Sequence, residues 1–263
     1  MKTASPETVL ITGASSGIGL ELARCFAADK STLVLVARTT SALEKLAAEL
    51  RKEHDITVHV LTADLSRPES PGKISSELEG RGIAVDVLVN NAGFGLQGAF
   101  ASLPLPGQLE IIQVNLTALV ELTGLFLPGM LKRKRGGILN VGSVAGFLPG
   151  PCMAIYYASK AFVQSFTEAL AEETAGSGVA INVLCPGPTE SNFGTVARGG
   201  KARIMQTPKM SAVAVAQYGH RKFRAGRVVA IPGGLNRLLV FTPRILPRSM
   251  ARKLVKRYNR PVE

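Results

Sequence analysis

Three side chains in the middle of the chain have the types and the spacing needed for proton transfer to a carbonyl oxygen. Tyr156 and Lys160 are four residues apart in the run YYASK, and Ser143 stands thirteen residues before Tyr156. Residues four apart lie on one face of a helix, so the Lys160 ammonium can favour the phenolate form of Tyr156. A serine hydroxyl can donate to a developing oxyanion. The trio predicts carbonyl reduction or alcohol oxidation, with Tyr156 as the proton donor.

Tyr157 is the alternative proton donor. Only Tyr156 has the spacing of four residues to Lys160, and this favours Tyr156. A tyrosine and a lysine at this spacing could also simply pack together on a helix surface. The presence of Ser143 and Asn115 in the same chain favours the chemical interpretation.

A glycine-rich segment near the start of the chain could hold the second reactant. Residues 12–19 read TGASSGIG and follow an apolar run at 8–12. Such a strand-to-helix turn lets the backbone approach a pyrophosphate, and the helix N-terminus supplies free N–H groups. The spacing differs from the common GxGxxG pattern, and a tight turn without a ligand is the alternative. The expected dinucleotide contacts here are Gly13, Ser15, Ser16, Gly17, Ile18 and Gly19.

The end of the second predicted strand indicates which dinucleotide is used. This strand ends in Val36-Ala37-Arg38, and no acid appears before Glu44. An acid at this place would bind the ribose hydroxyls of NAD, whereas an arginine accommodates the 2′-phosphate of NADP. Arg38 therefore predicts NADP(H) as the cofactor. The alternative is a solvated arginine at a strand end.

Apolar runs and amphipathic stretches alternate along the chain. Strands are expected at residues 8–12, 31–37, 56–61, 84–90, 137–141, 179–184 and 227–231, and helices at 17–29, 41–52, 109–131 and 156–174. This alternation predicts an α/β fold with a Rossmann-type, doubly wound parallel sheet of about seven strands and helices on both faces. We expect a single domain over residues 1–263.

Further motifs complete a pattern that resembles the short-chain dehydrogenase/reductase family. Asp64-Leu65 follows the third strand, Asn90-Asn91-Ala92-Gly93 follows the fourth, and Asn115 lies in the long helix. Pro186-Gly187-Pro188-Thr189 follows the sixth strand. Together with TGASSGIG, Ser143 and the Tyr156/Lys160 pair, these motifs match the family in order and spacing as far as Thr189.

The resemblance implies a role for each motif. It places Asp64 and Leu65 against the adenine, Asn91, Ala92 and Gly93 along the cleft, and Pro186, Gly187 and Thr189 at the nicotinamide end. It also implies that Lys160 grips the nicotinamide ribose and that Asn115 holds a water that relays protons to it. The implied catalytic residues are Asn115, Ser143, Tyr156 and Lys160. Without the family, Asp64 could cap a helix and residues 90–93 could be a plain turn.

The residues expected around the substrate are mostly apolar. They are Phe94, Ser143, Val144, Phe147, Cys152, Met153, Tyr156 and Phe193. Such a wall suits an apolar ketone, aldehyde, steroid or acyl compound, although several of these residues could instead fill the core. Residues of about 188–210 are expected to form a lid, because they follow the nicotinamide loop and carry Gly194, Gly199 and Gly200.

The positive charge is concentrated in the last quarter of the chain. Residues 198–263 hold 16 Lys and Arg against one acid, Glu263, a net charge of +15, whereas residues 1–197 hold 15 bases and 18 acids, a net charge of −3. In the extension at about 233–263, apolar residues and bases alternate. This suits a membrane surface, an acidic partner such as an acyl-CoA or acyl-carrier protein, or a packed helix with a solvated basic face. Nucleic-acid binding is disfavoured because aromatic residues are not interleaved.

The cysteine pattern and the hydropathy of the chain indicate the cellular compartment of the protein. Cys25, Cys152 and Cys185 are scattered, which argues for a reducing compartment and against disulfides or a metal site. The polar N-terminus is not a signal peptide. No spanning helix is expected, because the most apolar stretch, 111–130, contains Asn115 and Glu121. We expect a cytoplasmic protein, either free or peripheral at a membrane surface.

These observations lead to one expected activity and two alternatives. We expect an NADP(H)-dependent oxidoreductase that acts on a carbonyl or alcohol. The alternatives are an NAD-dependent alcohol or steroid dehydrogenase and a regulatory protein that senses NADP without turnover. A sensor would usually lose the tyrosine or the lysine. The resemblance implies a homodimer or homotetramer, formed through the helices at 109–131 and 156–174.

Overall fold

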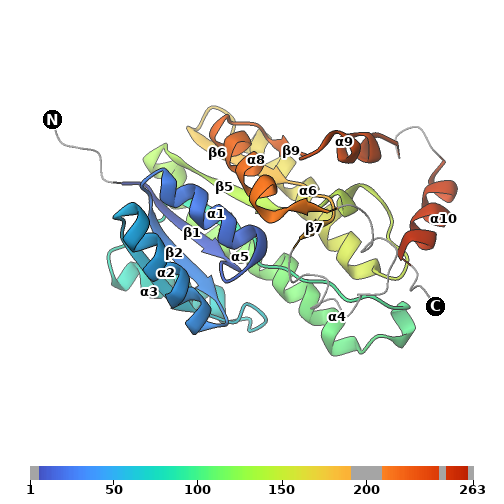
Figure 1. Ribbon diagram of the computed structural model, residues 1–263, viewed down its shortest axis with the longest axis horizontal. Helices are drawn as coiled ribbons and strands as arrows, with labels where there is room; N and C mark the ends of the chain where they lie inside the picture. Colours follow the sequence, from blue (N-terminus) through green and yellow to red (C-terminus); the bar gives the residue numbers. More distant parts are fainter. Residues whose placement is uncertain (1–5, 191–208, 243–246, 260–263) are drawn as a thin grey trace.

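The computed structural model describes residues 6–190, 209–242 and 247–259, and Figure 1 shows them as a sheet between two layers of helices. Seven parallel strands run in the order β3-β2-β1-β4-β5-β6-β9. Their bounds are β1 Thr8–Thr12, β2 Thr32–Ala37, β3 Val58–Thr62, β4 Val87–Asn90, β5 Gly136–Val141, β6 Val179–Leu184 and β9 Val229–Ala230. The order reverses between β1 and β4, which is where doubly wound sheets bind their ligands.

Successive residues of each central strand point to opposite faces of the sheet. On β1, Val9 and Ile11 join one core while Leu10 joins the other. Leu33 and Val34 divide in the same way on β2. Because both faces are covered, the strands read as continuous apolar runs without alternation.

Helices cover both faces, as the sequence predicted. The first core is closed by α1 (Gly17–Ala28), α2 (Thr40–His54) and α8 (Ala212–Arg224). The second is closed by α3 (Ser70–Gly80), α5 (Ala118–Arg133) and α6 (Ala154–Glu173). Fully buried Phe26 of α1 packs edge-on against Phe223 of α8, with ring centroids 6.1 Å apart. Burial of such a side chain stabilises the fold by roughly 1.5–3 kcal/mol.

Several element boundaries differ from the sequence prediction, most of them by one to three residues. The expected helix at 109–131 is α4 (Leu105–Ile112), a π-helical turn η2 (Gln113–Thr117) and α5 in succession. Helices α3 and α8 were not predicted. Expected strand 227–231 is shorter, because only Val229–Ala230 pairs with β6. Contacts with distant parts of the chain decide where these elements begin and end, and the local sequence pattern does not show such contacts.

The helix Leu105–Arg133 is long and apolar enough, by length and composition alone, to cross a membrane. This differs from the sequence expectation that no such helix exists. A third of the most apolar 18-residue stretch of this helix is buried inside the protein. Ala118, Leu122 and Met130 from it pack into the second core beside the sheet. Its packing is that of a layer helix of the fold.

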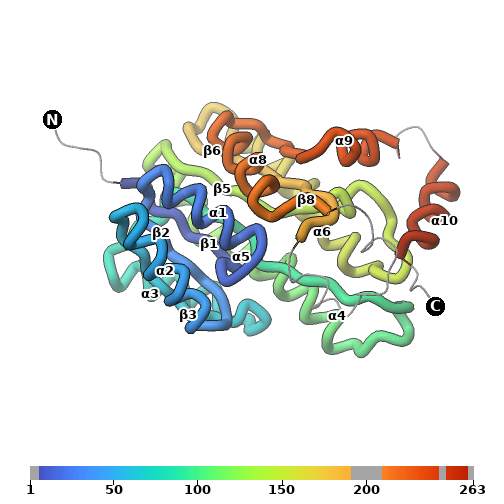
Figure 2. The backbone as a smooth tube through the Cα atoms, viewed as in Figure 1, coloured from blue at the N-terminus to red at the C-terminus, as the bar shows by residue number. Residues whose placement is uncertain are grey.

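The end of the chain forms a separate group of elements at one end of the molecule. Thr189–Glu190 (β7) pairs in parallel with Met210–Ser211 (β8). Helices α9 (Gly234–Phe241) and α10 (Arg248–Asn259) then follow α8 and β9, and the trace in Figure 2 places them far from the N-terminal end. Most of the expected lid at 188–210 lies outside the described residues.

Candidate active site

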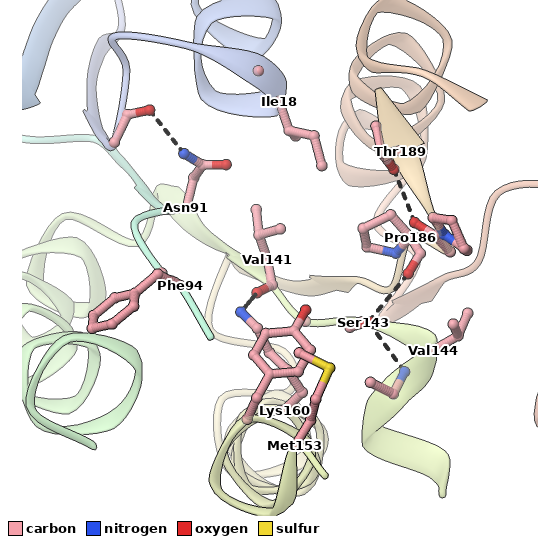
Figure 3. Close-up of a pocket in the computed structure, with 18 of the residues that line it drawn as sticks. Ile18, Asn91, Phe94, Val141, Ser143, Val144, Met153, Lys160, Pro186 and Thr189 are labelled. Atoms are coloured by element: carbon pink, nitrogen blue, oxygen red, sulfur yellow. Dashed lines mark hydrogen bonds between the residues drawn. The ribbon is translucent and has the colours of Figure 1, made fainter. Parts of the chain in front are cut away.

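A cavity of about 750 Å³ opens at the carboxyl edge of the sheet. Residues just beyond the ends of β1, β4, β5 and β6 line it, and Figure 3 shows them converging on one space. All of the predicted dinucleotide contacts except Gly19 line this cavity: Gly13, Ser15, Ser16, Gly17, Ile18, Arg38, Asp64, Leu65, Asn91, Ala92, Gly93, Tyr156, Lys160, Pro186, Gly187 and Thr189.

The glycine-rich turn is shaped by its contact with the loop after β4. Gly13 has φ +65°, and a Cβ added to it would lie 2.8 Å from Asn91 Nδ2 and 3.0 Å from Ala92 Cα. A Cβ on Gly19 would likewise collide with the Asn91 amide. Gly19 was predicted as a cofactor contact, but the structure places it behind the turn. It lets α1 approach Asn91 and does not line the cavity.

A hydrogen-bonded brace joins β1 to β4 beneath the turn. Thr12 Oγ1 accepts from the backbone N–H of Asn91 at 3.0 Å and of Ala92 at 3.1 Å, and donates to Val89 O at 3.2 Å. Asn91 Nδ2 donates back to Thr12 O at 2.9 Å and Gly13 O at 3.1 Å (Figure 3). The Asn91 amide therefore holds the turn in place, in addition to lining the cavity.

The N-terminus of α1 fits the pyrophosphate of a dinucleotide. Ser16 occupies the N-cap position in an extended conformation, no described side chain caps the helix, and its first turn contains no acid. The first N–H groups of a helix have no partner within the helix, and its N-terminus carries a partial positive charge. Ser16, Gly17 and Ile18 present this end to the cavity.

Arg38 and Asp64 lie together at the opposite end of the cavity from the catalytic trio. Exposed Arg38 follows β2, and Asp64 Oδ1 accepts from Ser66 N at 3.1 Å. Burial acts to raise the pKa of Asp64, but the Ser66 hydrogen bonds and the charges of Arg38 and Arg67 outweigh it, so the pKa is lowered. Asp64 thus begins a turn, as its alternative interpretation held, and also lines the cavity as an anion.

Ser143, Tyr156 and Lys160 meet at the floor of the cavity. Ser143 Oγ accepts from Ala145 N at 3.1 Å and donates to Pro186 O at 3.4 Å, and it also shares a hydrogen bond with the Tyr156 hydroxyl. Lys160 Nζ donates to Val141 O at 2.8 Å and lies 5.9 Å from the centre of the Tyr156 ring. The helix α6 and the end of β5 therefore bring all three groups together.

Burial sets the protonation states of Tyr156 and Lys160. It raises the pKa of Tyr156 to about 12, against a smaller opposing effect of the Ser143 hydrogen bond. It lowers the pKa of Lys160 to about 8. The expected lowering of the Tyr156 pKa by Lys160 is not found, because burial of the hydroxyl outweighs the interactions that would lower the pKa. Tyr156 is therefore protonated at neutral pH and can act as a donor.

Tyr157 is occupied elsewhere. Its hydroxyl donates to Asn259 Oδ1 of α10 at 3.2 Å. The ring is buried, at 6% exposure, and packs against the backbone of Gly150. Of the two tyrosines, Tyr156 is the one that interacts with Ser143, in agreement with the choice made from spacing.

Asn115 is buried at 1% exposure in the π-helical turn η2 and does not line the cavity. Its Oδ1 accepts from Phe94 N, and its Nδ2 donates to Phe94 O and Ser159 Oγ, each at 3.0 Å. The side chain therefore joins the loop after β4 to α6. Helix α6 also carries Lys160, and π-helical turns often mark functional sites. The proton relay expected at Asn115 stays a prediction.

The predicted substrate residues separate into three groups. Phe94, Ser143, Val144, Met153 and Tyr156 line the cavity. Phe147 and Cys152 do not; Phe147 packs against an apolar cluster formed by Leu119, Val163, Val183 and Cys185. The 3-10 turn that follows Ser143 directs Phe147 away from the cavity, so this prediction was wrong. Phe193 lies outside the described residues.

Sequence reasoning missed the wall that the C-terminal helices contribute. Beyond the predicted residues, the cavity is lined by Gln97, Glu110, Leu148, Tyr157, Leu235, Asn236, Leu239, Ala251, Leu254, Val255 and Tyr258, among others. The signal was present in the spacing of four between Ala251, Val255 and Asn259, which predicts one buried helix face.

The model of the family described as short chain dehydrogenase matches residues 7–201. The chain belongs to the short-chain dehydrogenase/reductase family. The members of this family bind a nicotinamide cofactor and act on carbonyl or hydroxyl groups, so the chain is an oxidoreductase of this type. The site geometry, derived from this chain alone, agrees with that membership.

Three members illustrate the relation. The ketoacyl reductase HetN of Nostoc is 34% identical over 82% of this chain and 76% of its own length. A very-long-chain 3-oxoacyl-CoA reductase of Phaeosphaeria nodorum is 38% identical over 66% of this chain. The solved structure of a short-chain dehydrogenase from Sphingobium yanoikuyae in complex with NADPH is 34% identical, with a TM-score of 0.82 over 90% of this chain and 93% of that one.

The lengths of these relatives differ from that of this chain. The match with the Phaeosphaeria reductase spans 52% of that protein, so the chain corresponds to about half of its length. The family model ends at residue 201, before α8, α9 and α10. The cavity wall formed by α9 and α10 therefore lies beyond the region that defines the family.

Proposed function

We propose that the protein is an NADPH-dependent reductase of apolar carbonyl compounds, and that 3-oxoacyl thioesters are its substrate class. The observation that carries the proposal is the convergence of Ser143, Tyr156 and Lys160 on the floor of a cavity. The far end of that cavity is a glycine-rich helix N-terminus.

The residues of this chain would prepare the carbonyl for reduction. When bound, a reduced nicotinamide would supply the hydride to the carbonyl carbon. Ser143 Oγ and the Tyr156 hydroxyl already share a hydrogen bond, so a carbonyl oxygen placed between them could accept from both. Tyr156 then gives its proton to that oxygen. The resulting phenolate would lie near the Lys160 ammonium, whose Nζ is 5.9 Å from the centre of the Tyr156 ring.

Arg38 supports NADPH over NADH. It is exposed at the end of β2 and lines the cavity, and no carboxylate of the described chain lies within ion-pair distance of it. A guanidinium binds a phosphate through two hydrogen bonds. The Sphingobium relative was solved with NADPH, which agrees with this choice.

The wall of the cavity supports an apolar substrate with a chain or another bulky group. Phe94, Val144 and Met153 line one side near Tyr156, and Leu235 and Leu254 extend the apolar lining to the mouth. The volume of about 750 Å³ also has to hold the dinucleotide, so the apolar lining is the observation that supports such a substrate. Two of the relatives are named as ketoacyl and 3-oxoacyl-CoA reductases, and this makes the 3-oxoacyl group the first class to test.

The test is a measurement of NADPH and NADH oxidation by absorbance. The substrates would be 3-oxoacyl thioesters of increasing chain length, with a steroid ketone and a bulky aryl ketone for comparison. We expect kcat/KM to rise with acyl length and to be higher with NADPH. Equal rates with NADH would contradict the cofactor, and preference for the steroid would contradict the substrate class. Cofactor binding without turnover of any substrate would indicate a sensor.

The family commonly oligomerises, and one face of this protein suits a homodimer. Leu109 of α4, Leu125 of α5 and Phe162 of α6 are exposed at 54%, 44% and 42%, on the two helices expected to pair. An exposed apolar face on paired helices is typical of an interface. Sedimentation velocity would show a dimer, and Leu125→Glu with Phe162→Glu would dissociate it. A monomeric wild type would contradict this proposal.

A further inference from the structure

Part of the cavity wall consists of exposed apolar side chains of α9 and α10, and this part is here called the mouth. Leu235 and Leu239 of α9 and Leu254 and Tyr258 of α10 all line the cavity. The same four side chains are 69%, 42%, 51% and 46% exposed, respectively. They are therefore both the wall of the cavity and part of the outer surface. A water-soluble substrate would gain little from such a rim.

The exposed apolar surface continues beyond the mouth on the same two helices. Leu238 and Phe241 of α9 and Met250 of α10 are 60%, 52% and 56% exposed, and none of them lines the cavity. Single exposed apolar residues are ordinary in proteins, whereas a concentration of them marks an interaction surface. The two helices together contribute seven such side chains at one end of the molecule (Figure 1).

The surface around this apolar patch is strongly basic. Helix α10 carries Arg248, Arg252, Lys253, Lys256 and Arg257, and all five are exposed. In the part of the chain that the structure describes, none of them forms an ion pair or a hydrogen bond. Five unpaired positive charges on one 12-residue helix attract an anionic surface.

Two apolar stripes run along α10, and only one is buried against the domain. Ala251, Val255 and Asn259 are buried against the domain, at 4%, 8% and 0% exposure. Met250, Leu254 and Tyr258 lie one position earlier in each turn and form a second, exposed stripe. The bases occupy the remaining circumference. A helix with an apolar stripe beside a basic face is typical of an element that lies in a membrane interface.

A buried hydrogen-bond network fixes α10 to the catalytic helix. Asn259 Nδ2 donates to Pro151 O at 3.0 Å, and its Oδ1 accepts from the Tyr157 hydroxyl at 3.2 Å. Its backbone carbonyl accepts from Gln97 Nε2 at 2.7 Å. Tyr157 is the neighbour of Tyr156, so any surface that binds α10 has a fixed orientation relative to the site.

We propose that the exposed face of α9 and α10 docks on an anionic lipid bilayer, with the mouth of the cavity against the lipid. An acidic soluble partner would satisfy the bases but would leave Leu238, Phe241 and Met250 in water. A bilayer with anionic headgroups accepts both parts of the surface. An apolar carbonyl compound could then pass from the bilayer into the cavity. That last step rests on the proposed function, whereas the docking itself does not.

The docking is tested by sedimentation with vesicles of phosphatidylcholine, made with and without phosphatidylserine, in the absence of cofactor. We expect the wild type to bind only the vesicles that contain phosphatidylserine. Binding should weaken as the salt rises from about 0.1 M to about 1 M, because the screening length falls from ~10 Å to ~3 Å. Failure of the wild type to bind the anionic vesicles would overturn the proposal.

Two sets of variants separate the charge from the apolar contribution. Lys253→Glu with Arg257→Glu should weaken vesicle binding at least about tenfold, and so should Leu238→Ser with Phe241→Ser and Met250→Ser. None of these residues lines the cavity, so NADPH oxidation with a short, soluble ketone should stay within about twofold of the wild type. This activity is measured without vesicles, so a failure of the proposed reaction remains distinguishable from a failure of docking.

Matched controls come from other exposed faces. Lys45→Glu with Lys52→Glu on α2 reverses the same charge, and Phe100→Ser with Leu105→Ser removes exposed apolar side chains at the start of the long helix, outside the cavity and outside the proposed dimer face. Both should bind vesicles like the wild type. Loss of binding in the second control would place the membrane contact on the long helix and overturn the proposal. If the variant with Leu238→Ser, Phe241→Ser and Met250→Ser bound vesicles like the wild type, the proposal would also be overturned. The basic face would then fit an acidic partner better than a bilayer.

Discussion

The floor and the mouth of the cavity are built from opposite kinds of surface. At the floor, Ser143 and Lys160 are 8% and 6% exposed, and each is bonded to a backbone carbonyl at the end of a strand. At the mouth, Leu235 and Leu254 are 69% and 51% exposed, and the bases of α10 beside them form no ion pair with any residue that the structure describes. The floor is fixed by directional hydrogen bonds. The mouth is defined by apolar shape and charge.

This difference indicates that the floor suits proton transfer and that the mouth suits contact with an apolar substrate. Hydrogen bonds fix atoms to within fractions of an ångström, as proton transfer requires. Apolar contact is not directional, so the mouth can accept chains of varied shape. The family model covers the floor but ends before α9 and α10. We propose that the floor carries the chemistry and that the wall formed by α9 and α10 contributes to substrate selection.

The strongest test of the floor is Tyr156→Phe. It removes the proton donor and keeps the ring, so kcat should fall by about 100- to 10,000-fold. NADPH binding, followed by the fluorescence of the reduced cofactor, should remain close to that of the wild type. Tyr157→Phe is the matched control and should retain far more activity. Near-normal turnover by Tyr156→Phe would remove the tyrosine from the reaction.

The next largest effect is expected at the far end of the cavity, with Arg38→Asp. Loss of the phosphate contact should reduce the preference for NADPH over NADH by about 10- to 100-fold, since a hydrogen bond to a charged group contributes about 1.5–3 kcal/mol. The measurement is the ratio of kcat/KM for the two cofactors. Lys45→Asp on the neighbouring helix α2 makes the same charge change away from the cavity and should leave the ratio unchanged. An unchanged ratio in Arg38→Asp would contradict its role.

Asn259→Ala tests whether the hydrogen bonds between α10 and the region of Tyr157 keep α10 in place at the mouth of the cavity. It removes the side-chain bonds to Tyr157 and Pro151 while keeping the backbone bond from Gln97. We expect KM for a long-chain substrate to rise by about three- to thirtyfold, with a much smaller change in KM for a short one. Hydrogen exchange in α10 should become faster. Equal changes for both chain lengths would show that α10 does not select the substrate.

The smallest effect concerns stability and pH. The pKa of Lys160 is about 8 in the folded protein, below its ordinary 10.5. Above pH 8 the unfolded chain therefore binds more protons than the folded one, and the free energy of unfolding rises with pH. Between pH 8 and 9 the gain should be about 1 kcal/mol. Lys160→Met should abolish it, and Lys45→Met should not.

The pH window of this measurement is limited by the cysteines. Burial raises the pKa of Cys185 from 9.0 to about 12 and that of Cys25 from 9.0 to about 11. The folded protein holds these protons longer than the unfolded chain, so both thiols lower the stability as pH rises toward and past 9. The difference between the wild type and Lys160→Met at pH 8 and pH 9 isolates the lysine, because both proteins carry the same cysteines. A Lys160→Met variant with the same slope as the wild type would contradict its burial as an amine.

The parts of the site that the sequence predicted are those fixed by local backbone requirements. Gly13 needs a positive φ in a strand-to-helix turn, and Tyr156 and Lys160 are related by helical spacing, so both could be inferred without coordinates. The central strands were predictable because both faces of the sheet are covered, as for Leu10 and Val34.

The parts that the sequence did not predict depend on which way a side chain points after a turn. Phe147 and Val144 follow Ser143 in the same 3-10 turn, but only Val144 lines the cavity. Gly19 belongs to the right motif, yet it acts through its contact with Asn91. Helices α9 and α10 were taken as a charged extension, because their buried partners, such as Tyr157, are about a hundred residues away in the sequence. Such contacts are invisible to local pattern.

The bond between Tyr157 and Asn259 joins residues 102 positions apart. On the ribosome, the strands and helices that carry Tyr156 emerge well before α10 is made, since domains begin to fold while synthesis continues. A nascent chain would thus assemble its reactive groups first and receive the wall beside them last. Until that moment the side of the cavity that α9 and α10 form is missing.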